Sequence, residues 1–574
     1  MRKRFRRKQG NGVFRNRIYS QSLRKTELQF VRWIEPRGAE PATLHPFRTV
    51  VTTRLCPRGR RTNTGMGFPI SGRKVLSFQS FTFAAFLAAA VGGFYAVPKK
   101  GRLAVLLIFN ILFFEWADPF AGIWLLSSVC LTWGCALLVE KGADRTKRLL
   151  LIGACLSFQL ILLAVFKYLP VWNEIINKTY GRGLQIVHLD VAAKFGLVAP
   201  IGISFYTLEA IGYLIDVSRG KYPAEKSFWR FAAFLSFFPN IMSGPIERGD
   251  HFLGQLRGIT KKKRRELLNY DRVMQGLIAM LLGYGMKLIV AQRAEILVNQ
   301  VYSMYQDANS FTMLMAALFY AVQIYCDFAS YSMIAVGVGR LFGFELVQNF
   351  KQPYFARNLT DFWRRWHISL SSWLRDYIYI PLGGGRRGLA VRQRNILLVF
   401  LISGLWHGGA PQFLAWGLLH GAGQVVQDFY KKAKQAVFGE AKIGLEKLRH
   451  MLSVLLTFFT VMCFWIFFRS ESVSMAVICL KNMFTRWNGF LYWRQFLFTM
   501  GLEKTQFFIA VAGIAVLLGI DLISEKKKQE PAVWIYRMPL PVRWAICLFL
   551  IGAVFVVGQY GKGFDPSGFI YVEF

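Results

Sequence analysis

Long apolar runs separated by short polar loops follow one another along most of the chain. A membrane-spanning helix needs roughly 20 mostly apolar residues to cross the hydrocarbon layer. Backbone polar groups find no water there, so such runs predict a bundle of helices. The apolar runs are residues 76–97, 103–117, 119–139, 149–168, 194–216, 228–246, 273–291, 310–326, 395–406, 412–426, 451–468, 506–523 and 543–560. Several are short, and we expect some to merge or to be re-entrant, which leaves about eleven crossings.

Two of these runs are interrupted by glycine, proline and polar residues. PIGISFYTLEAIGYLIDVSRG (200–220) contains Glu209, and FFPNIMSGPIERGDHFLGQL (237–256) contains Pro239 and Pro245, which we expect to break a helix. Irregular or polar backbone at membrane depth is tolerated only against protein or a water-filled cavity. We therefore predict an all-α, polytopic bundle with interfacial and re-entrant helices around a central tunnel.

Composition supports a membrane protein and explains a charge that would otherwise suggest another function. The 574 residues are 54% hydrophobic and 16% aromatic, and their net charge is +39. Much of this charge lies in loops between apolar runs, with a cluster at ITKKKRRELLNYDR (259–272). Basic loops beside spans fit the positive-inside rule and contact with anionic membrane lipid. No nucleic-acid recognition motif accompanies the charge, so we expect no nucleic-acid partner.

Residues 1–65 differ from the rest of the chain. They are basic, show little periodicity and lack the apolar region of a secretory signal, so they predict a disordered tail. Met66 then opens MGFPISGRKVLSF, a suitable start for a polytopic protein, and we place one domain at 66–574. Two interpretations of the tail stay open: an inert extension or artefact of start-site choice, and a basic arm that binds anionic lipid.

Two motifs that carry chemistry in other proteins are excluded by their context. The eight cysteines include no C-x-x-C pair and no Cys/His cluster, so we predict neither a disulfide framework nor a metal site. GGGRRG (383–388) matches G-x-G-x-x-G, but no acidic residue lies between Tyr377 and Gln427 to bind a ribose. A dinucleotide fold also needs a βαβ unit, which the pattern does not provide. The glycines instead predict a tight turn at the membrane surface.

The segment DFWRRWHISLSSWLRDYIYIPL (361–382) predicts an amphipathic helix over 361–377. Apolar side chains recur at three- and four-residue spacing and make one stripe, while arginine and serine fall largely on the other side. Tryptophan at the edge of such a stripe is typical of a helix in the membrane interface. His367 lies at the border of the stripe, as a satisfied interfacial residue or as part of a site.

The stretch LWHGGAPQFLAWGLLHG (405–421) places two of the seven histidines among apolar and aromatic residues. A helix is expected to end at Gly408-Gly409-Ala410-Pro411, which puts His407 at the end of a buried helix. An ionisable residue there predicts a functional site, and burial favours the neutral imidazole that a general base needs. The alternative is a structural histidine bonded to a backbone carbonyl. For His420 we expect a packing or supporting role.

These segments together resemble a known family. QIYCDFASYSMIAVGVGRLFGFELVQNFKQPYFARNLTDFWRRWHISLSSWLRDYIYIPLGG, followed by RNILLVFLISGLWHGGAPQFLAWGLLHG, is similar to the membrane-bound O-acyltransferase family. The branch it resembles includes alginate O-acetylase membrane subunits and polysaccharide- and peptidoglycan-acetylating relatives. The C-terminal GFIYVEF also fits, and the likeness covers roughly 66–574. Family members usually lack a basic tail, so residues 1–65 depart from the pattern.

The resemblance implies an O-acyltransferase in the cell membrane. It implies that His407, the histidine of W-H-G, is catalytic and that His367, the histidine of W-R-R-W-H, is the second catalytic residue. We expect Trp406, Asn395 and His420 to support them. We expect arginines on or after the interfacial helix to bind a phosphorylated donor, unless they only anchor lipid headgroups. These arginines are Arg364, Arg365, Arg375, Arg386 and Arg387.

The expected reaction moves an acyl group, most simply acetyl from acetyl-CoA, from the cytoplasm toward a surface polysaccharide. No bound cofactor is expected; an extracytoplasmic acetyltransferase partner or a glycan would accept the group. Three other functions stay open: D-alanyl-type transfer from a carrier-protein thioester, an inactive scaffold, and a transporter or flippase. A transporter often shows repeat symmetry, which is not visible here. A membrane glycosyltransferase commonly needs an acidic metal-binding pair, and no D-x-D occurs.

Overall fold

The computed structural model describes most of the chain after its basic N-terminal segment. The described residues are 76–117, 121–142, 144–180, 200–438, 446–487, 498 and 500–560. The predicted tail 1–65, its boundary at Met66 and the C-terminal segment 568–574 lie outside these residues, and what was inferred about them stays a prediction.

Every regular element among the described residues is a helix, which confirms the predicted all-α membrane bundle. The helices long and apolar enough to cross a membrane are Gly122–Glu140, Arg145–Tyr168, Tyr270–Ser303, Ser310–Leu341, Leu389–His407, Glu446–Arg469, Lys504–Lys527 and Leu540–Val557. Two shorter apolar helices are Phe81–Ala96 and Val473–Thr485. The expected number of about eleven crossings stays a prediction.

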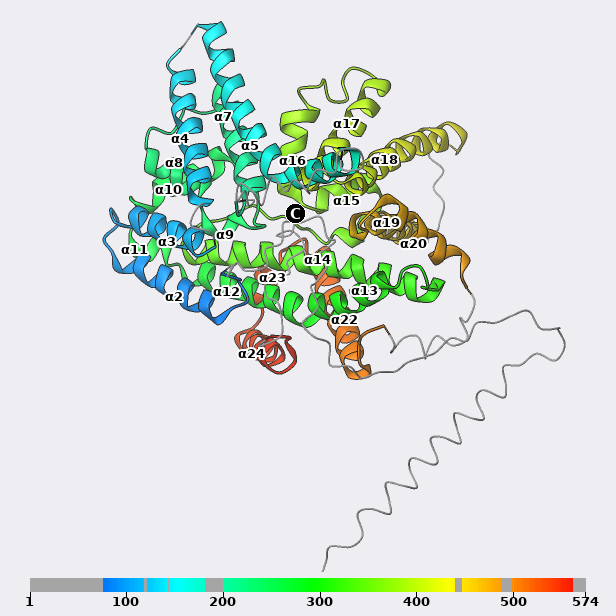
Figure 1. Cartoon of the computed structure of the whole chain (residues 1–574). Coiled ribbons are helices and arrows are strands. Elements are labelled where there is room, and N and C mark those ends of the chain that lie inside the picture. Colours follow the sequence, from blue (N-terminus) through cyan, green and yellow to red (C-terminus); the bar gives the residue numbers. More distant parts are fainter. Residues whose placement is uncertain are drawn as a thin grey trace, which may run out of the picture. The chain divides into compact units, whose positions relative to one another are not determined.

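The N-terminal helices form one side of the bundle. They are α2 (Phe81–Ala96), α3 (Arg102–Ala117), α4 (Ala121–Glu140) and α5 (Arg145–Tyr180). Each packs against the next, as short connections between antiparallel helices favour, and α4 and α5 together contact α7 (Ile203–Ser218). In Figure 1 this group occupies the blue and cyan part of the molecule.

The predicted run 228–246 is not one span. It contains α8 (Phe228–Leu235) and the single turn α9 (Phe238–Ile241), and the chain continues to α10 (Gly249–Ile259) and α11 (Arg264–Leu267). Pro239 lies in the first turn of α9, where proline is tolerated because its missing N–H has no partner in a helix anyway. The predicted break is confirmed, but Pro239 begins α9 and does not end a helix.

The helix α14 (Ser310–Leu341) is the central element of the structure. Asn309 starts it by accepting a hydrogen bond from the N–H of Thr312 at 2.9 Å. A continuous run of α12 (Tyr270–Gly285), the π-helix η1 (Met286–Ala291) and α13 (Gln292–Ser303) packs along it. Figure 1 shows α14 crossing the middle of the bundle, with α12 and α13 beside it.

The segment after α14 carries both predicted motifs. Its elements are η2 (Pro353–Phe355), α15 (Leu359–Arg365), α16 (Ile368–Leu374), the π-helix η3 (Arg375–Tyr379), α17 (Leu389–His407) and α18 (Pro411–Phe438). Helices α17 and α18 form an antiparallel pair, and α15 packs between α18 and the following α19.

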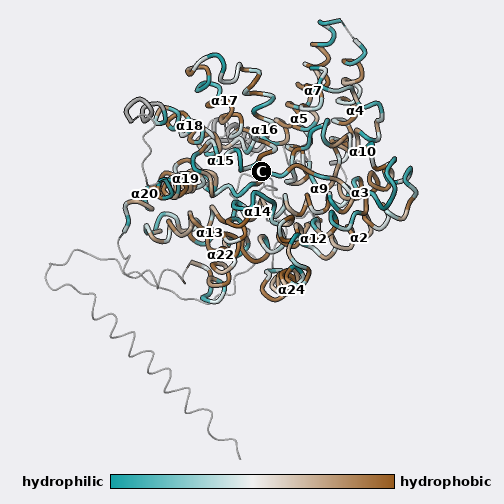
Figure 2. Tube along the Cα trace, turned by 180° about the vertical axis from the view of Figure 1, so that it is seen from behind, coloured by the Kyte–Doolittle hydropathy of each residue, from teal (hydrophilic) through white to brown (hydrophobic). Residues whose placement is uncertain are grey.

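The C-terminal helices complete the bundle, with α19 and α20 on α14 and the later helices on the side of α12. They are α19 (Glu446–Arg469), α20 (Val473–Thr485), α22 (Lys504–Lys527), α23 (Pro531–Tyr536) and α24 (Leu540–Val557). Helices α23 and α24 pack on α12, and α22 packs on η1. Large apolar side chains on α24, such as Leu548, Phe549 and Val556, are exposed, and Figure 2 shows the helix coloured as hydrophobic. We expect this face to contact lipid.

Candidate active site

A break at Trp366 and His367 separates two short helices. Asn358 caps the start of α15 by accepting a hydrogen bond from the N–H of Asp361 at 2.8 Å. The helix ends where Trp366 becomes extended, and His367 then adopts a left-handed backbone with φ of 44°. Such a residue costs about 1–3 kcal/mol unless its surroundings hold it. The predicted continuous helix over 361–377 is therefore wrong.

The apolar stripe exists, but it packs against protein. Phe362, Trp366 and Leu370 are each 1% exposed, which does not suit a helix lying on the membrane surface. The ring of Trp366 lies 5.0 Å from that of Trp465 on α19, centre to centre. The segment is thus an internal element, and its aromatic residues are core residues rather than interface anchors.

Hydrogen bonds from earlier parts of the chain hold the backbone after His367. The N–H of Ile368 donates to the carbonyl of Asn349 at 3.0 Å. The buried Asn349 side chain accepts from the hydroxyl of Ser369 at 2.6 Å, and the Ser369 oxygen accepts from the N–H of Ile246 at 3.1 Å. These contacts fix the left-handed residue in place.

The helix end predicted at the second motif is confirmed. His407 is the last residue of α17, and α18 begins at Pro411. The two helices pack with their backbones in close approach: a Cβ added to Gly417 would lie 2.3 Å from the carbonyl oxygen of Phe400. Only glycine permits this approach, so the pair is held at one spacing.

The structure brings His367 and His407 together around one tryptophan. The ring centre of Trp406 lies 5.9 Å from that of His367 and 4.9 Å from that of His407. Phe328 of α14 packs on His367 at 4.7 Å, and Trp416 of α18 packs on His407 at 5.0 Å. The two imidazoles are 0% and 2% exposed. A buried neutral imidazole can accept a proton from a hydroxyl group brought next to it.

Comparison with known proteins decides the family. The family model of the membrane-bound O-acyltransferases matches residues 218–440, which include both histidines. A probable alginate O-acetylase AlgI of Pseudomonas syringae pv. tomato is 32% identical over 463 residues, which are 79% of this chain and 84% of that protein. This chain belongs to the membrane-bound O-acyltransferase family.

Other relatives of this acyltransferase act on different polymers. A peptidoglycan O-acetyltransferase of Helicobacter pylori is 32% identical over 385 residues, or 62% of this chain and 69% of that protein. A teichoic acid D-alanyltransferase of Bacillus subtilis is 30% identical over 248 residues, or 41% of this chain and 60% of that protein. The predicted family, enzyme class and multi-pass membrane location are confirmed, and the transporter and scaffold alternatives are set aside.

His420 of the acyltransferase holds a neighbouring tryptophan. The indole N–H of Trp363 donates to Nδ1 of His420 at 3.2 Å. An indole nitrogen can only donate, so this ring nitrogen carries no proton. His420 is fully buried and also packs against Trp416 at 5.1 Å. Its supporting role stays a prediction. The contacts place His420 against Trp416, the ring that also packs on His407.

Lys167 was missed at the sequence level. It lies near the end of the span Arg145–Tyr168 and donates to the carbonyl of Trp406, while Tyr168 donates to the carbonyl of Leu405 at 2.5 Å. Carbonyls in the last turn of a helix have no partner inside it. Lys167 and Tyr168 of α5 therefore close the end of α17 that carries His407. The available signal was a lone lysine in an apolar run.

Asn395 holds the glycine turn. Its side-chain amide donates to the carbonyls of Leu382 at 3.2 Å and Gly384 at 3.0 Å. Gly383 and Gly384 have φ values of 100° and 57°, so the turn needs glycine and the predicted tight turn is confirmed. Asn395 lies twelve residues before His407 on α17, or about 18 Å along the helix. Its predicted supporting role stays a prediction.

The five arginines predicted to bind a donor have different surroundings. Arg365 pairs with Asp361 at 3.0 Å and with Glu525 at 2.8 Å, and Arg375 pairs with the adjacent aspartate at 2.8 Å. The other three are exposed: Arg364 on α15, and Arg386 and Arg387 on the glycine turn. The exposed guanidinium groups that pair with no described carboxylate are the ones available to a phosphorylated ligand.

Proposed function

We propose that this acyltransferase moves an acetyl group from cytoplasmic acetyl-CoA across the plasma membrane toward a hydroxyl group of a surface polysaccharide. The observation that carries the proposal is the pair of buried histidines, His367 and His407, packed on Trp406. The relatives named as alginate and peptidoglycan O-acetyltransferases support acetyl as the group and a glycan as the final acceptor.

In the proposed step, His407 acts as the general base. Its imidazole takes the proton of the acceptor hydroxyl while the hydroxyl oxygen attacks the thioester carbonyl. A C–O bond forms, the C–S bond breaks, and the proton passes from the imidazole to the leaving thiolate. General-base help typically contributes about 10²–10⁴-fold in rate, and positioning supplies most of the remainder. Closure of the α17 end by Lys167 supports such positioning.

His367 has a supporting role in this proposal. Its backbone is left-handed, and its neighbours Ile368 and Ser369 are bound by Asn349, so the ring is held in one place. A fixed imidazole at this position can polarise the thioester carbonyl or shape the tunnel through which the donor enters. We expect its loss to cost less than the loss of His407.

We infer the direction of transfer from the distribution of charge. Basic loops mark the cytoplasmic side, where the thioester donor is made. We propose that Arg386 and Arg387, exposed on the glycine turn, meet the phosphates of coenzyme A. On the other side, an extracytoplasmic acetyltransferase partner or the glycan itself receives the group.

The test uses purified protein in proteoliposomes with labelled acetyl-CoA and a hydroxyl acceptor. We expect label transfer by the wild type, none by His407→Gln, and a raised KM for acetyl-CoA with little change in stability for Arg386→Gln with Arg387→Gln. Unchanged acetyl-CoA dependence would assign these arginines to lipid headgroups.

The same assay separates the alternative donor. The similarity to teichoic acid D-alanyltransferases favours a carrier-protein thioester as the competing reaction. Transfer from a D-alanylated carrier protein, together with none from acetyl-CoA, would overturn the acetyl assignment.

A further inference from the structure

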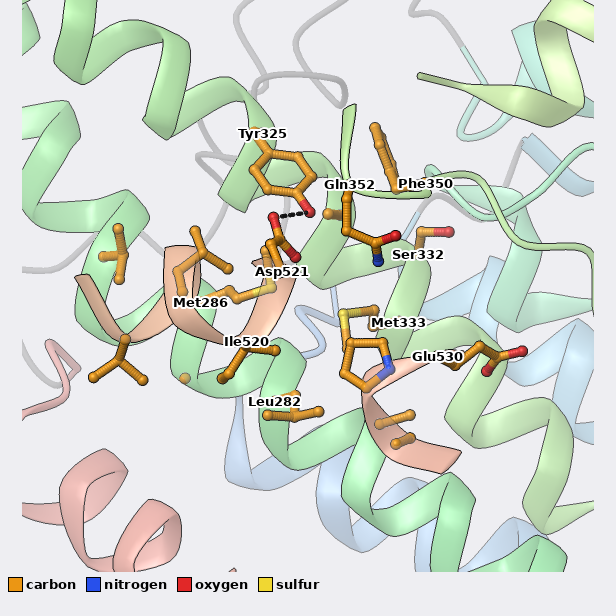
Figure 3. Close-up of a pocket in the computed structure, with 18 of the residues that line it drawn as sticks. Leu282, Met286, Tyr325, Ser332, Met333, Phe350, Gln352, Ile520, Asp521 and Glu530 are labelled. Carbon is orange, nitrogen blue, oxygen red and sulfur yellow. Dashed lines mark hydrogen bonds between the residues drawn. The ribbon is translucent and has the colours of Figure 1, made fainter. Parts of the chain in front are cut away.

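A cavity of about 950 Å³ lies between α12, η1 and α14 on one side and α22, α23 and α24 on the other. Its lining includes neither His367 nor His407. Figure 3 shows its wall, where Tyr325 donates a hydrogen bond to Asp521 at 3.0 Å. The volume is at the upper end of the range of about 300–1,000 Å³ found for small-molecule sites.

The inner part of the cavity suits a hydrocarbon chain. Its walls come from four membrane spans, so this part lies at membrane depth. Apolar side chains from these spans line it, among them Leu282, Met286, Val290, Met333, Ile520 and Leu550. An acetyl group has only two carbons and would leave this space unfilled, whereas a fatty acyl chain would bury its methylenes here.

The mouth of the cavity carries cations without an acidic partner. Lys351, Arg364 and Arg537 line it, are exposed, and form no ion pair with any described carboxylate. The four acidic residues of the lining have other partners. Asp361 and Glu525 pair with Arg365, Glu530 pairs with Arg340, and Asp521 accepts a hydrogen bond from Tyr325 on the inner wall.

These cations lie level with the ends of the spans, on the cytoplasmic side. Lys351 follows the end of α14, and Arg537 lies between the end of α22 and the start of α24. Arg272 belongs to the basic cluster 259–272 at the start of α12, and it pairs at 3.1 Å with Glu345, which follows α14. The basic cluster is therefore on the same side as Lys351. Basic loops face the cytoplasm, whose leaflet contains anionic lipid.

We propose that this cavity binds one anionic glycerophospholipid of the cytoplasmic leaflet. Its phosphate lies at Lys351, Arg364 and Arg537, and one of its acyl chains lies among the apolar side chains of the spans. The lipid then has the orientation of its neighbours in the leaflet. In this position the lipid connects α22, α23 and α24 to α12 and α14. The lipid site does not depend on the acetyl-transfer proposal.

Substitution of Gly285 tests the chain site. This helical glycine lines the cavity, and a Cβ added to it meets no atom within 4 Å, so we expect the ring of Gly285→Phe to enter the cavity. Gly519→Phe is the matched control, because Gly519 is also helical and unobstructed but does not line the cavity. Native mass spectrometry of delipidated protein, titrated with phosphatidylglycerol, counts the lipid bound.

We expect one tightly held phosphatidylglycerol on the wild type and on Gly519→Phe, and none on Gly285→Phe. Equal lipid counts on the two phenylalanine variants would overturn the chain site. Thermal unfolding of the same samples shows whether each variant is folded. A folded Gly285→Phe protein that still binds the lipid would contradict the proposal.

A charge series tests the headgroup site. The triple variant Lys351→Gln, Arg364→Gln and Arg537→Gln should bind phosphatidylglycerol roughly tenfold or more weakly, since each cation attracts an anionic lipid. The control removes the same charge at Lys261, Lys262 and Lys526, which are exposed and outside the cavity lining. Phosphatidylcholine should bind less well than phosphatidylglycerol, and inorganic phosphate should not bind. Equal effects of the two triple variants, or binding of phosphate alone, would overturn the headgroup assignment.

Discussion

The histidine region and the cavity region of this acyltransferase are built in opposite ways. Around His367 and His407, aromatic rings from several helices pack on the imidazoles, and both imidazoles are buried. Between α12 and α24 the helices leave about 950 Å³ open, and unpaired cations stand at its mouth. Each region joins segments that are far apart in the chain, but packed aromatic rings dominate the first and open space the second.

The difference indicates what each region does. A group that moves a proton must be held at one distance from the reacting atoms, and close packing of aromatic rings provides this. A lipid site needs room for a flexible chain and a charge for its headgroup, so it tolerates looser packing. Substitutions that alter volume should therefore be costly in the first region and cheap in the second.

The largest expected effect comes from the histidines. We expect His407→Ala to lower acetyl transfer roughly 100-fold or more, because general-base help is worth about 10²–10⁴-fold. His367→Ala should lose less, and the double variant should be little worse than His407→Ala if both act in one step. His450→Ala is the control, since His450 is exposed at the start of α19. Activity of His407→Ala within about threefold of wild type would remove it from the mechanism.

The next effect concerns packing of the hairpin that carries His407. Gly417→Ala places a methyl group 2.3 Å from a backbone oxygen of α17, which cannot move aside as a side chain could. We expect a loss of about 1–3 kcal/mol in stability, as for other overpacked sites. Gly519→Ala should be neutral or slightly stabilising, because its surroundings are open. Equal thermal midpoints for the two variants in detergent would contradict close helix approach.

Much of this region could be predicted from the sequence, and the reasons for the failures are physical. The end of α17 was predictable because Gly408 and Pro411 act locally on the backbone. The break at His367 was not, because the groups that hold it, Asn349 and Ile246, are distant in the chain. The periodicity of 361–377 showed which side chains share a face but not that protein covers that face.

The cavity was out of reach of sequence reasoning for the same reason. Its walls come from α12, α14, α22 and α24, and no local pattern tells which spans meet. Of the basic residues at its mouth, the sequence singles out only Arg364, which it predicts to bind a phosphorylated donor unless it anchors a lipid headgroup. Only the unpaired charge beside an apolar space favours lipid.

A smaller effect is expected from the hydrogen bonds that position His367. Ser369→Ala would remove the hydroxyl that donates to the buried side chain of Asn349 and would leave the N–H of Ile246 without its acceptor, at a cost of about 1–3 kcal/mol. We expect kcat to fall with KM unchanged, because the ring of His367 shifts. Ser369→Thr, which keeps the hydroxyl, should recover most activity. A raised KM with unchanged kcat would instead place Ser369 in donor binding.

The smallest effect concerns a titratable contact, between His251 and Glu247, next to the segment that holds His367. His251 Nδ1 lies 2.7 Å from Glu247, and Glu247 also accepts a hydrogen bond from the N–H of Val347, two residues before Asn349. The hydrogen bond to Glu247 raises the pKa of His251, burial opposes this, and the charges of Asp250 and Glu345 add to the rise.

Because the pKa of His251 is higher in the folded than in the unfolded protein, protonation stabilises the fold. The contribution is complete below the unfolded pKa of about 6.5 and is lost as pH rises through the folded value. The pair is partly exposed, so we expect at most about 1 kcal/mol. Thermal midpoints measured from pH 5.5 to 8.5 should fall more for the wild type than for His251→Gln. Parallel pH profiles of the two proteins would show that the contact does not support the loop before His367.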